Sequence, residues 1–254
     1  MVAVSGSTEK IQAAVIGAGP AGLMAAERLA RAGFQVHVFD GMRSPARKFL
    51  RAGVGGLNLT HADEFDEFCT HYSQADTVRL WLQQFTPSRL REWAASMGVE
   101  TFVGTSRRVF PIQKKASPLL RAWLRTLDGL GVRMHMAHRW VGWTAGVSES
   151  APELGFETPN GLRIVNARVC VLALGGASWR RLGSDGSWAA LLQADGIECA
   201  PFQAANCGFN YAWSDHIRTH CAGTALKAVR LRLEDSAGSF SRLGEAMISR
   251  HGIQ

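Results

Sequence analysis

Residues 11–40 read IQAAVIGAGPAGLMAAERLARAGFQVHVFD. An apolar run, 13–16, leads into a glycine-rich turn and an alanine-rich stretch, and a second apolar run ends on Asp40. Strand, glycine turn, helix, strand and acidic residue, in this order, are typical of a dinucleotide site. The segment therefore predicts a βαβ unit that binds a dinucleotide.

Each glycine of the turn has its own steric role. Gly17 permits the tight turn, Gly19 lets the backbone approach a pyrophosphate, and Gly22 lets the helix lie close to the strand. The N-terminus of the helix offers unpaired N–H groups and a partial positive charge to the phosphates. Asp40 follows Gly17 by 23 residues, where its carboxylate can accept both hydroxyls of an adenosine ribose.

The composition is that of an ordinary soluble globular protein, because 46% of the residues are apolar and 19% are charged. A length of 254 residues fits one large domain or one and a half. Residues 1–10 are short and polar, which does not fit a signal peptide, and no apolar run approaches ~18 residues. We therefore predict a cytoplasmic protein with no membrane partner.

The net charge of +7 at neutral pH permits a nucleic-acid partner or an anionic substrate. The basic residues are scattered, however, and small clusters are typical of solvated faces or phosphate contacts. The densest groups are Arg107-Arg108, Lys114-Lys115 and Arg180-Arg181. This distribution argues against a nucleic-acid partner.

The cysteines and histidines indicate no metal. Five cysteines contain no CxxC pair and no even framework, which suits a reducing compartment and argues against a dithiol redox centre or a zinc site. The eight histidines are scattered, and each is interpreted as a surface or core residue. No catalytic side chain is named.

The stretch 41–61 reads GMRSPARKFLRAGVGGLNLTH and is predicted to be a loop. A loop of this length is usually functional or disordered, and its apolar residues favour a function. Its glycines suit a backbone that packs against a flat ring or a phosphate. The alternative is that the loop is purely structural, in which case Arg47 and Lys48 would only face water.

Apolar spacing predicts helices over 62–98, with a start at Thr86-Pro87 and an end at Gly98. A strand over 99–105 and a turn over 106–111 follow. Ser117-Pro118 predicts the N-cap and first turn of a helix over 119–130.

Short strands are predicted over 132–136, 140–144, 154–158, 162–165 and 168–174, with a hairpin at Asn160-Gly161. A second glycine turn contains Gly175 and Gly176, and a short helix runs through Gln193. The domain boundary is placed near Gly196. Beyond it we predict an irregular stretch over 200–210, a helix near 214–220, and strands over 227–234 and 243–248.

Several motifs occur together, in order and at sensible distances: GAGPAGLMAA (17–26), RKFLRAGVGGLNLTH (47–61), RVFP (108–111), ALGGAS (173–178), GSDG (183–186) and ANCGF (205–209). In these motifs the chain resembles the BaiN/YhiN-type (HI-like) FAD-dependent flavoproteins, closest to an uncharacterised bacterial subgroup. The family carries a GGGRCN-like string where this chain reads GGLN at 55–58, so the arginine and the cysteine of that string are absent here. Leu174 replaces a usual threonine, and Arg107 stands where a glycine is expected.

The resemblance implies an α/β fold with a glutathione-reductase-type, Rossmann-like FAD-binding domain over 1–196. This domain would contain a parallel sheet, a helical segment over 62–130 and a β-meander over 132–174. Residues 197–254 would begin a second, mainly β domain that is inserted into the first.

The resemblance also implies site residues for FAD. The pyrophosphate would be held by Gly17, Ala18, Gly19, Pro20, Ala21 and Gly22, and the adenosine ribose by Asp40. Arg47 and Lys48 would neutralise phosphate charge, and Asn58 and Thr60 would lie near the flavin. The strand at Trp140 would pair its backbone with adenine, and Gly175 and Gly176 would close over the cofactor.

The residues themselves also favour FAD over NAD. Ala26 permits close packing of the helix, a meander precedes the second glycine turn, and no second GxGxxG opens a nicotinamide domain. NAD(P)H stays possible as a transient electron donor. We expect an oxidoreductase that passes a hydride through flavin N5 to a small unsaturated or carbonyl-conjugated substrate. The alternatives are a flavin-dependent nucleic-acid modifier or RNA-binding flavoprotein, and an inactive truncated fragment.

Residues 244–254 resemble a family segment, GE…T..GI.G, that lies inside the second domain. We therefore expect the chain to be incomplete at its C-terminus. It would keep the ADP half of the site and lack part of the isoalloxazine half, and the strands of 197–254 lack obvious partners.

Overall fold

The computed structural model describes residues 9–144, 153–204, 208–235 and 238–254. The chain divides into two compact units, Met1–Ala200 and Pro201–Gln254. The division lies just beyond Gly196, where the composition changes. Most of the ANCGF motif (205–209) lies outside the described residues.

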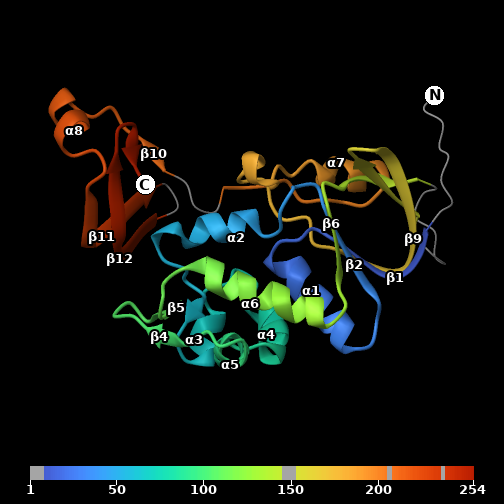
Figure 1. Cartoon of the computed structure of the whole chain (residues 1–254). Helices are drawn as coiled ribbons and strands as arrows, with labels where there is room; N and C mark the ends of the chain where they lie inside the picture. The colour runs from blue at the N-terminus through green and yellow to red at the C-terminus, as the bar shows by residue number, and fades with distance from the viewer. Residues whose placement is uncertain (1–8, 145–152, 205–207, 236–237) are drawn as a thin grey trace. The chain divides into compact units, whose positions relative to one another are not determined.

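The first unit is built on a six-stranded sheet of order β6-β2-β1-β9-β8-β7 (Figure 1). Four strands are parallel: β6 (Arg133–Met136), β2 (Val36–Asp40), β1 (Glu9–Ile16) and β9 (Gly161–Leu172). The strands β8 (Glu153–Thr158) and β7 (Arg139–Trp143) extend this sheet in antiparallel fashion as a meander. The predicted α/β, Rossmann-like class is confirmed.

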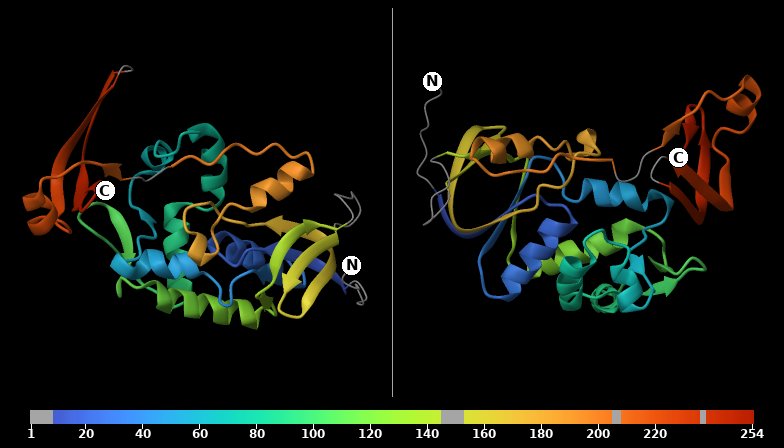
Figure 2. Two further views of the ribbon diagram at one scale, coloured as in Figure 1. Left: turned by 90° about the horizontal axis from the view of Figure 1, so that it is seen from above. Right: turned by 180° about the vertical axis from the view of Figure 1, so that it is seen from behind.

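The second half of the central strand β1, residues 13–16, is buried on both faces. Val15 packs into a cluster that contains side chains of α1 (Pro20–Arg31) and α6 (Ala116–Gly129). Ile16 packs into a second cluster beside α7 (Trp188–Ala194). Side chains of a strand alternate between faces, so a strand with helices on both sides has to be apolar throughout. Figure 2 shows α1 in blue and α6 in green next to each other.

A buried carboxylate joins three helices of the first unit. Glu27 on α1 is only 4% exposed. Its Oε2 accepts hydrogen bonds from the indole Nε1 atoms of Trp93 (3.1 Å) and Trp123 (2.8 Å), and its Oε1 accepts one from Arg31 Nε (2.9 Å). Trp93 belongs to α5 (Pro87–Ser96). Because a buried charge is costly unless it is hydrogen-bonded, these bonds fix α1 against α5 and α6.

The segment between β2 and α6 is partly helical and carries a small antiparallel sheet of order β3-β5-β4. In chain order its elements are α2 (Arg47–Ala52), η1 (Gly53–Gly55), β3 (Thr60–His61), α3 (Phe65–Cys69), α4 (Ala75–Gln84), α5, β4 (Thr101–Val103) and β5 (Arg108–Pro111).

Two predictions for this segment are wrong. The stretch 41–61 was predicted to be a loop, yet it contains α2, η1 and β3; residues 106–111 were predicted to be a turn, yet they contain β5. The strand β5 pairs with the nearby β4, and it also pairs with the two-residue strand β3, which is distant in sequence. Local patterns do not reveal such a partner.

Three predictions for the later elements are also corrected. Helix α6 begins at Ala116 after Lys115, so Ser117 does not cap it. The strands predicted over 162–165 and 168–174 form the single strand β9, because β1 and β8 pair with it on its two sides. The strand β6 belongs to the parallel sheet rather than to the meander, because its partner is β2.

The second unit contains a four-stranded sheet of order β10-β13-β12-β11. Its elements are β10 (Phe209–Asn210), α8 (Asp215–His220), β11 (Ala225–Asp235), β12 (Gly238–Ser249) and β13 (Gly252–Ile253). The strands of this region therefore do have partners, contrary to the prediction, because β11 and β12 form a long hairpin.

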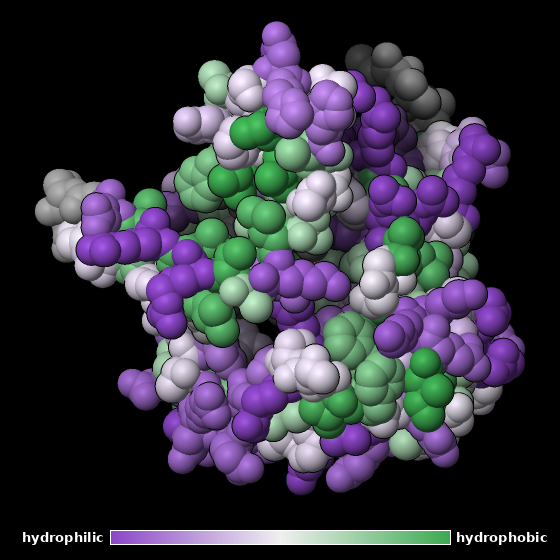
Figure 3. Space-filling view, turned by 90° about the vertical axis from the view of Figure 1, so that its left-hand side faces the viewer, coloured by the Kyte–Doolittle hydropathy of each residue, from purple (hydrophilic) through white to green (hydrophobic). Residues whose placement is uncertain are grey.

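Apolar side chains reach the surface of the β11–β12 hairpin. Leu231, Leu233 and Phe240 are each about half exposed, at 45%, 54% and 59%. Figure 3 shows hydrophobic residues in green beside hydrophilic residues in purple on one face of the molecule.

Among the described residues no helix is both long enough and apolar enough to cross a membrane.

A stack of buried rings makes stability depend on pH. His135 lies against Phe39, with ring centroids 4.6 Å apart, and its Nε2 is 3.1 Å from His37 Nδ1. Burial, together with the nearby Arg163 guanidinium, lowers the pKa of His135 to about 4. Burial also lowers the pKa of His37, although Glu9 acts in the opposite direction.

Acidification below about pH 6.5 should therefore destabilise the first unit. The folded chain keeps His135 neutral, whereas the unfolded chain binds a proton at about the ordinary pKa of 6.5. The free energy of unfolding should fall as the pH falls from about 6.5 to about 4. His135→Gln should flatten this dependence by on the order of 1 kcal/mol, while the same change at exposed His251 should leave it unchanged. Urea unfolding at a series of pH values measures both, and an unaltered slope in the His135 variant would contradict the assignment.

Candidate functional site

A cleft of about 340 Å³ opens where β1, β2 and β9 end. Its walls contain the residues that follow these three strands, among them Gly17, Asp40 and Leu174. Ligands of open α/β sheets bind at the carboxyl ends of the strands. The cleft is therefore the candidate functional site.

The three glycines of the turn differ in their surroundings. Gly17 has φ +107°, and a Cβ there would lie 2.2 Å from the Ala173 carbonyl oxygen. A Cβ on Gly22 would lie 1.8 Å from the Gly17 carbonyl oxygen. Around Gly19, by contrast, a Cβ would meet no atom within 4 Å. The fold itself needs Gly17 and Gly22, whereas Gly19 leaves open space in the wall of the cleft.

The N-terminus of α1 presents free donors to this space. Gly19 is the N-cap and Pro20 the first helical residue, and no side chain caps the helix. The first turn holds no acidic side chain. The backbone N–H groups of Gly19, Ala21 and Gly22 have no acceptor among the described residues. Such donors, combined with the helix dipole, form a site for an anion.

The Asp40 carboxylate joins the turn to the segment after β2. Its Oδ2 accepts from the backbone N–H of Ala18 and its Oδ1 from that of Met42, both at 2.7 Å. The Ala18 carbonyl in turn accepts from Ala46 N at 2.9 Å. Asp40 is half-buried in the cleft, and each of its oxygens still has a lone pair for a ligand hydroxyl.

Two basic residues of α2 line the cleft beside the turn. Lys48 Nζ donates to Ser178 Oγ at 2.6 Å and lies 3.4 Å from Ser184 Oγ. Arg47 Nη1 donates to Ser44 Oγ at 3.2 Å. Neither cation forms an ion pair among the described residues. Their charges are therefore available to an anionic ligand.

The opposite wall comes from β7 and the residue before it. His138, Arg139 and Trp140 line the cleft. Trp140 is only 6% exposed, and its indole Nε1 has no acceptor among the described residues. A buried donor without a partner is rare in proteins. It marks this wall as a place where a ligand acceptor would be favoured.

The second glycine turn closes the cleft next to β9. The Gly175 carbonyl accepts from Trp188 Nε1 at 3.1 Å, and the Gly176 carbonyl accepts from Ser184 Oγ at 2.7 Å. Gly175 has φ +73°, which favours glycine. Gly175 is in the cleft wall, while Gly176 is linked to it through Ser184.

Two predicted site residues lie elsewhere. Asn58 Nδ2 donates to the carbonyls of Thr60 and Val109, at 2.9 and 3.2 Å, so it supports the pairing of β3 with β5. Asn58 and Thr60 line a different cavity, together with His61 and His71. The structure thus brings together the predicted residues around α1, α2, β7 and Gly175, but not these two.

Sequence reasoning missed several residues of the cleft. Met42, Ser184 and Trp188 line the cleft and each contacts a predicted site residue, as does Ser178, which bonds to Lys48 from outside the cleft wall. Ser178 and Ser184 lie in the quoted ALGGAS and GSDG motifs. Their recurrence beside glycines was the available signal, but only the fold shows that Lys48 bonds to them.

The chain belongs to the HI0933-like protein Rossmann domain family, whose model matches residues 11–239. This confirms the resemblance that the motifs indicated, to a family of FAD-dependent flavoproteins. A comparison with curated proteins finds no match.

Solved structures show the same fold. A mutant FrdA of Escherichia coli quinol fumarate reductase is similar with a TM-score of 0.55 and 17% identity, over 68% of this chain and 34% of that one. The Mycobacterium smegmatis Sdh1 complex is similar with a TM-score of 0.55 and 16% identity, over 74% of this chain and 39% of that one. A 3-ketosteroid-delta4-(5alpha)-dehydrogenase from Rhodococcus jostii is similar with a TM-score of 0.52 and 15% identity, over 68% of this chain and 47% of that one. The chain thus spans between about a third and a half of the length of these structures.

Substitutions at two of the glycines should separate binding from folding. Gly19→Val would fill open space at an extended backbone (φ −77°, ψ 178°), so thermal unfolding should stay within a few degrees while FAD binding is lost. Gly22→Ala, a smaller change, should destabilise the chain by roughly 3 kcal/mol or more, because its Cβ would overlap the Gly17 carbonyl. FAD titration and circular dichroism on the same samples measure both effects. A valine variant that keeps FAD would disprove the role of Gly19.

Proposed function

We propose that this chain binds FAD in the cleft at the ends of β1, β2 and β9 and acts as a flavin-dependent oxidoreductase. One observation carries the proposal. Three backbone N–H groups at the N-terminus of α1 lack acceptors among the described residues, and Gly19, which carries one of them, lies in the cleft wall and leaves room for a ligand. A pyrophosphate supplies the acceptors and the negative charge that this arrangement favours.

The neighbouring residues fit the rest of an adenine dinucleotide. Asp40 would accept from the ribose hydroxyls with the lone pairs that Ala18 and Met42 leave free. Lys48 and Arg47 would offset the phosphate charge, because in the described part of the chain each is bonded to serine hydroxyls and to no carboxylate. The backbone of His138–Trp140 and the buried Trp140 Nε1 would meet the adenine.

When bound, FAD would supply hydride transfer at the flavin. The chain's own contribution is to bind and orient the cofactor through α1, Asp40 and Lys48. We propose a small unsaturated or carbonyl-conjugated compound as substrate and NAD(P)H as transient electron donor. The proposal for the donor can be tested by mixing the FAD-loaded chain with NADH or NADPH without oxygen. Loss of the visible flavin absorbance would support it, and an unchanged spectrum would remove it.

FAD binding is tested by titration of the full chain with FAD, ADP and riboflavin. Saturable binding of FAD and of ADP, with far weaker binding of riboflavin, would support a site that holds the ADP part. Equal binding of FAD and riboflavin would contradict it, because riboflavin has neither the pyrophosphate nor the adenosine. If FAD binds but ADP does not, the contacts that dominate FAD binding lie outside this cleft.

Replacement of Asp40 should weaken the binding of FAD more than the binding of riboflavin. Asp40→Asn removes the charge and one acceptor, so FAD affinity should fall by about 1–3 kcal/mol, or roughly 5- to 150-fold. Riboflavin affinity should not change. Asp195→Asn is the matched control, because Asp195 is exposed and absent from the cleft wall. Calorimetric titration of the three proteins decides the matter, and equal losses for the two ligands would count against a ribose contact.

A further inference from the structure

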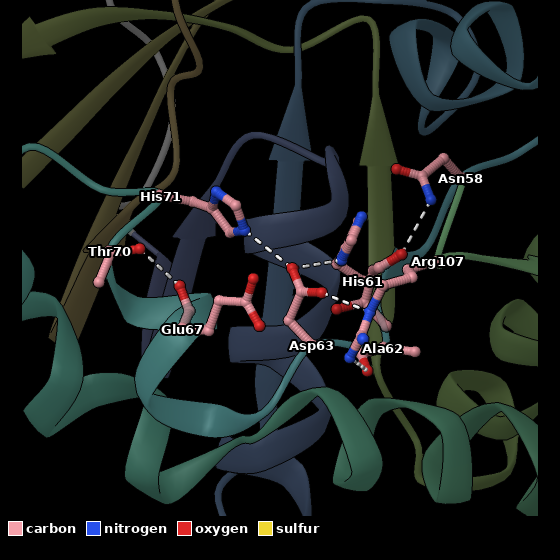
Figure 4. A network of polar contacts seen from close by, with 9 residues as sticks. Asn58, His61, Ala62, Asp63, Glu67, Thr70, His71 and Arg107 are labelled. Atoms are coloured by element: carbon pink, nitrogen blue, oxygen red, sulfur yellow. Dashed lines mark hydrogen bonds and ion pairs between the residues drawn. The ribbon is translucent and has the colours of Figure 1, made fainter. Parts of the chain in front are cut away.

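Two histidines and an aspartate converge outside the cleft (Figure 4). His61 ends β3, Asp63 follows it, and His71 comes just after α3. The ligand atoms of the three side chains all lie within 4.8 Å of one another. The Asp63 side chain is only 3% exposed, whereas those of His61 and His71 are 27% and 36% exposed. The group is thus anchored at the carboxylate and open at the imidazoles.

A single carboxylate oxygen faces both imidazoles. Asp63 Oδ2 lies 2.5 Å from His61 Nδ1 and 2.9 Å from His71 Nε2. His61 Nδ1 is buried, and despite this short distance it makes no properly directed hydrogen bond. His71 Nε2 is within hydrogen-bonding distance of Asp63 Oδ2, so a proton joins these two atoms in the metal-free chain. A divalent cation would replace that proton and would also bind the lone pair of His61 Nδ1, which has no partner among the described residues.

Arg107 holds the other oxygen of the same carboxylate. Its Nε is 2.7 Å from Asp63 Oδ1, and its Nη2 donates to the Ala62 carbonyl at 2.8 Å. These bonds leave Oδ2 directed at the two histidines (Figure 4). A ligand carboxylate is usually oriented by such an outer hydrogen bond.

The backbone of Arg107 is strained, which explains why a glycine was expected there. Its φ is +60°, in the turn between β4 and β5. A residue other than glycine costs about 1 kcal/mol in this left-handed region. The arginine side chain offsets this cost through Asp63 and Ala62. Strain that is kept in order to place a side chain is typical of functional sites.

We propose that His61 Nδ1, His71 Nε2 and Asp63 Oδ2 bind one divalent transition-metal ion of the class that imidazole prefers, with Zn²⁺ as the reference ion. Two imidazoles and a carboxylate are a common ligand set for such ions. The remaining coordination positions would face the cavity lined by Asn58, Thr60 and Tyr72, where water or a small ligand could complete the shell. The sequence-based expectation of no metal rested on cysteine spacing and on the scatter of the histidines along the chain, and this group contains no cysteine and is assembled only in the fold.

Binding requires a small local adjustment. Ligands at about 2.0–2.1 Å from Zn²⁺ in a tetrahedral shell are roughly 3.3 Å apart. The distance from Asp63 Oδ2 to His61 Nδ1, 2.5 Å, therefore has to widen by about 0.8 Å, and that to His71 Nε2, 2.9 Å, by about 0.4 Å. His71 lies in an exposed segment after a five-residue helix and can supply the second of these movements. The proposal does not depend on FAD binding.

The test is a titration of the chelator-treated full chain with Zn²⁺ and with Co²⁺. We expect one tight equivalent, and for Co²⁺ a visible absorption band from a low-coordinate site. His61→Asn, His71→Asn and Asp63→Asn should each weaken this binding at least about tenfold. Arg107→Gly should weaken it about 10- to 100-fold through the lost outer contact, without lowering the unfolding temperature, because glycine relieves the backbone strain.

A matched control separates this group from ordinary surface histidines. His216 and His220 lie one turn apart on α8, and both are exposed. The double variant His216→Asn/His220→Asn should keep the tight equivalent. Circular dichroism shows whether each variant is folded. If Asp63→Asn does not fold, His71→Asn decides the matter, because His71 is the more exposed ligand. Binding that disappears with His216 and His220, or that survives in folded His61 and His71 variants, would overturn the proposal.

Discussion

The structure depends on a close approach between the first glycine turn and the chain that follows β9. Gly17 lies against the Ala173 carbonyl and Gly22 against the Gly17 carbonyl, at distances that leave no room for a Cβ. This contact lets α1 start directly over the end of β1 and lie close to the sheet. The cleft, its free N–H donors and the position of Asp40 all follow from where α1 starts.

Hydrogen bonds to buried carboxylates then hold this arrangement in place. Asp40 and the Ala18 peptide group link the turn to the end of β2 and to the start of α2, so the basic residues of α2 lie beside the turn. Glu27 performs the same task at the other side of α1, where it joins that helix to the indoles of α5 and α6. Each oxygen of the two carboxylates accepts at least one hydrogen bond, which offsets the cost of taking its charge out of water.

Both candidate sites gather groups that a ligand of opposite character would complement. At the cleft an anion would do so, because Gly19, Lys48 and Arg47 line one space. At His61, Asp63 and His71 a cation would do so, because three potential ligand atoms lie within 4.8 Å of one another. In each case a strained or crowded backbone is retained: Gly17 at φ +107° and Arg107 at φ +60°. Strain of this kind indicates positions that are determined by more than local preference.

The sequence by itself determined the βαβ unit and the glycine turn, because these depend on local spacing and on the apolar run that becomes the buried half of β1. It also indicated Asp40 and Lys48 as site residues, which the structure brings to the same cleft. Only the tertiary structure decided the pairing of β3 with β5, the union of two predicted strands in β9 and the separation of Asn58 from the cleft. It also brought His61 and His71 to Asp63. The physical reason is that hydrogen-bonded pairing and convergence of charged side chains involve residues distant in sequence, whose distances are set by packing rather than by local pattern.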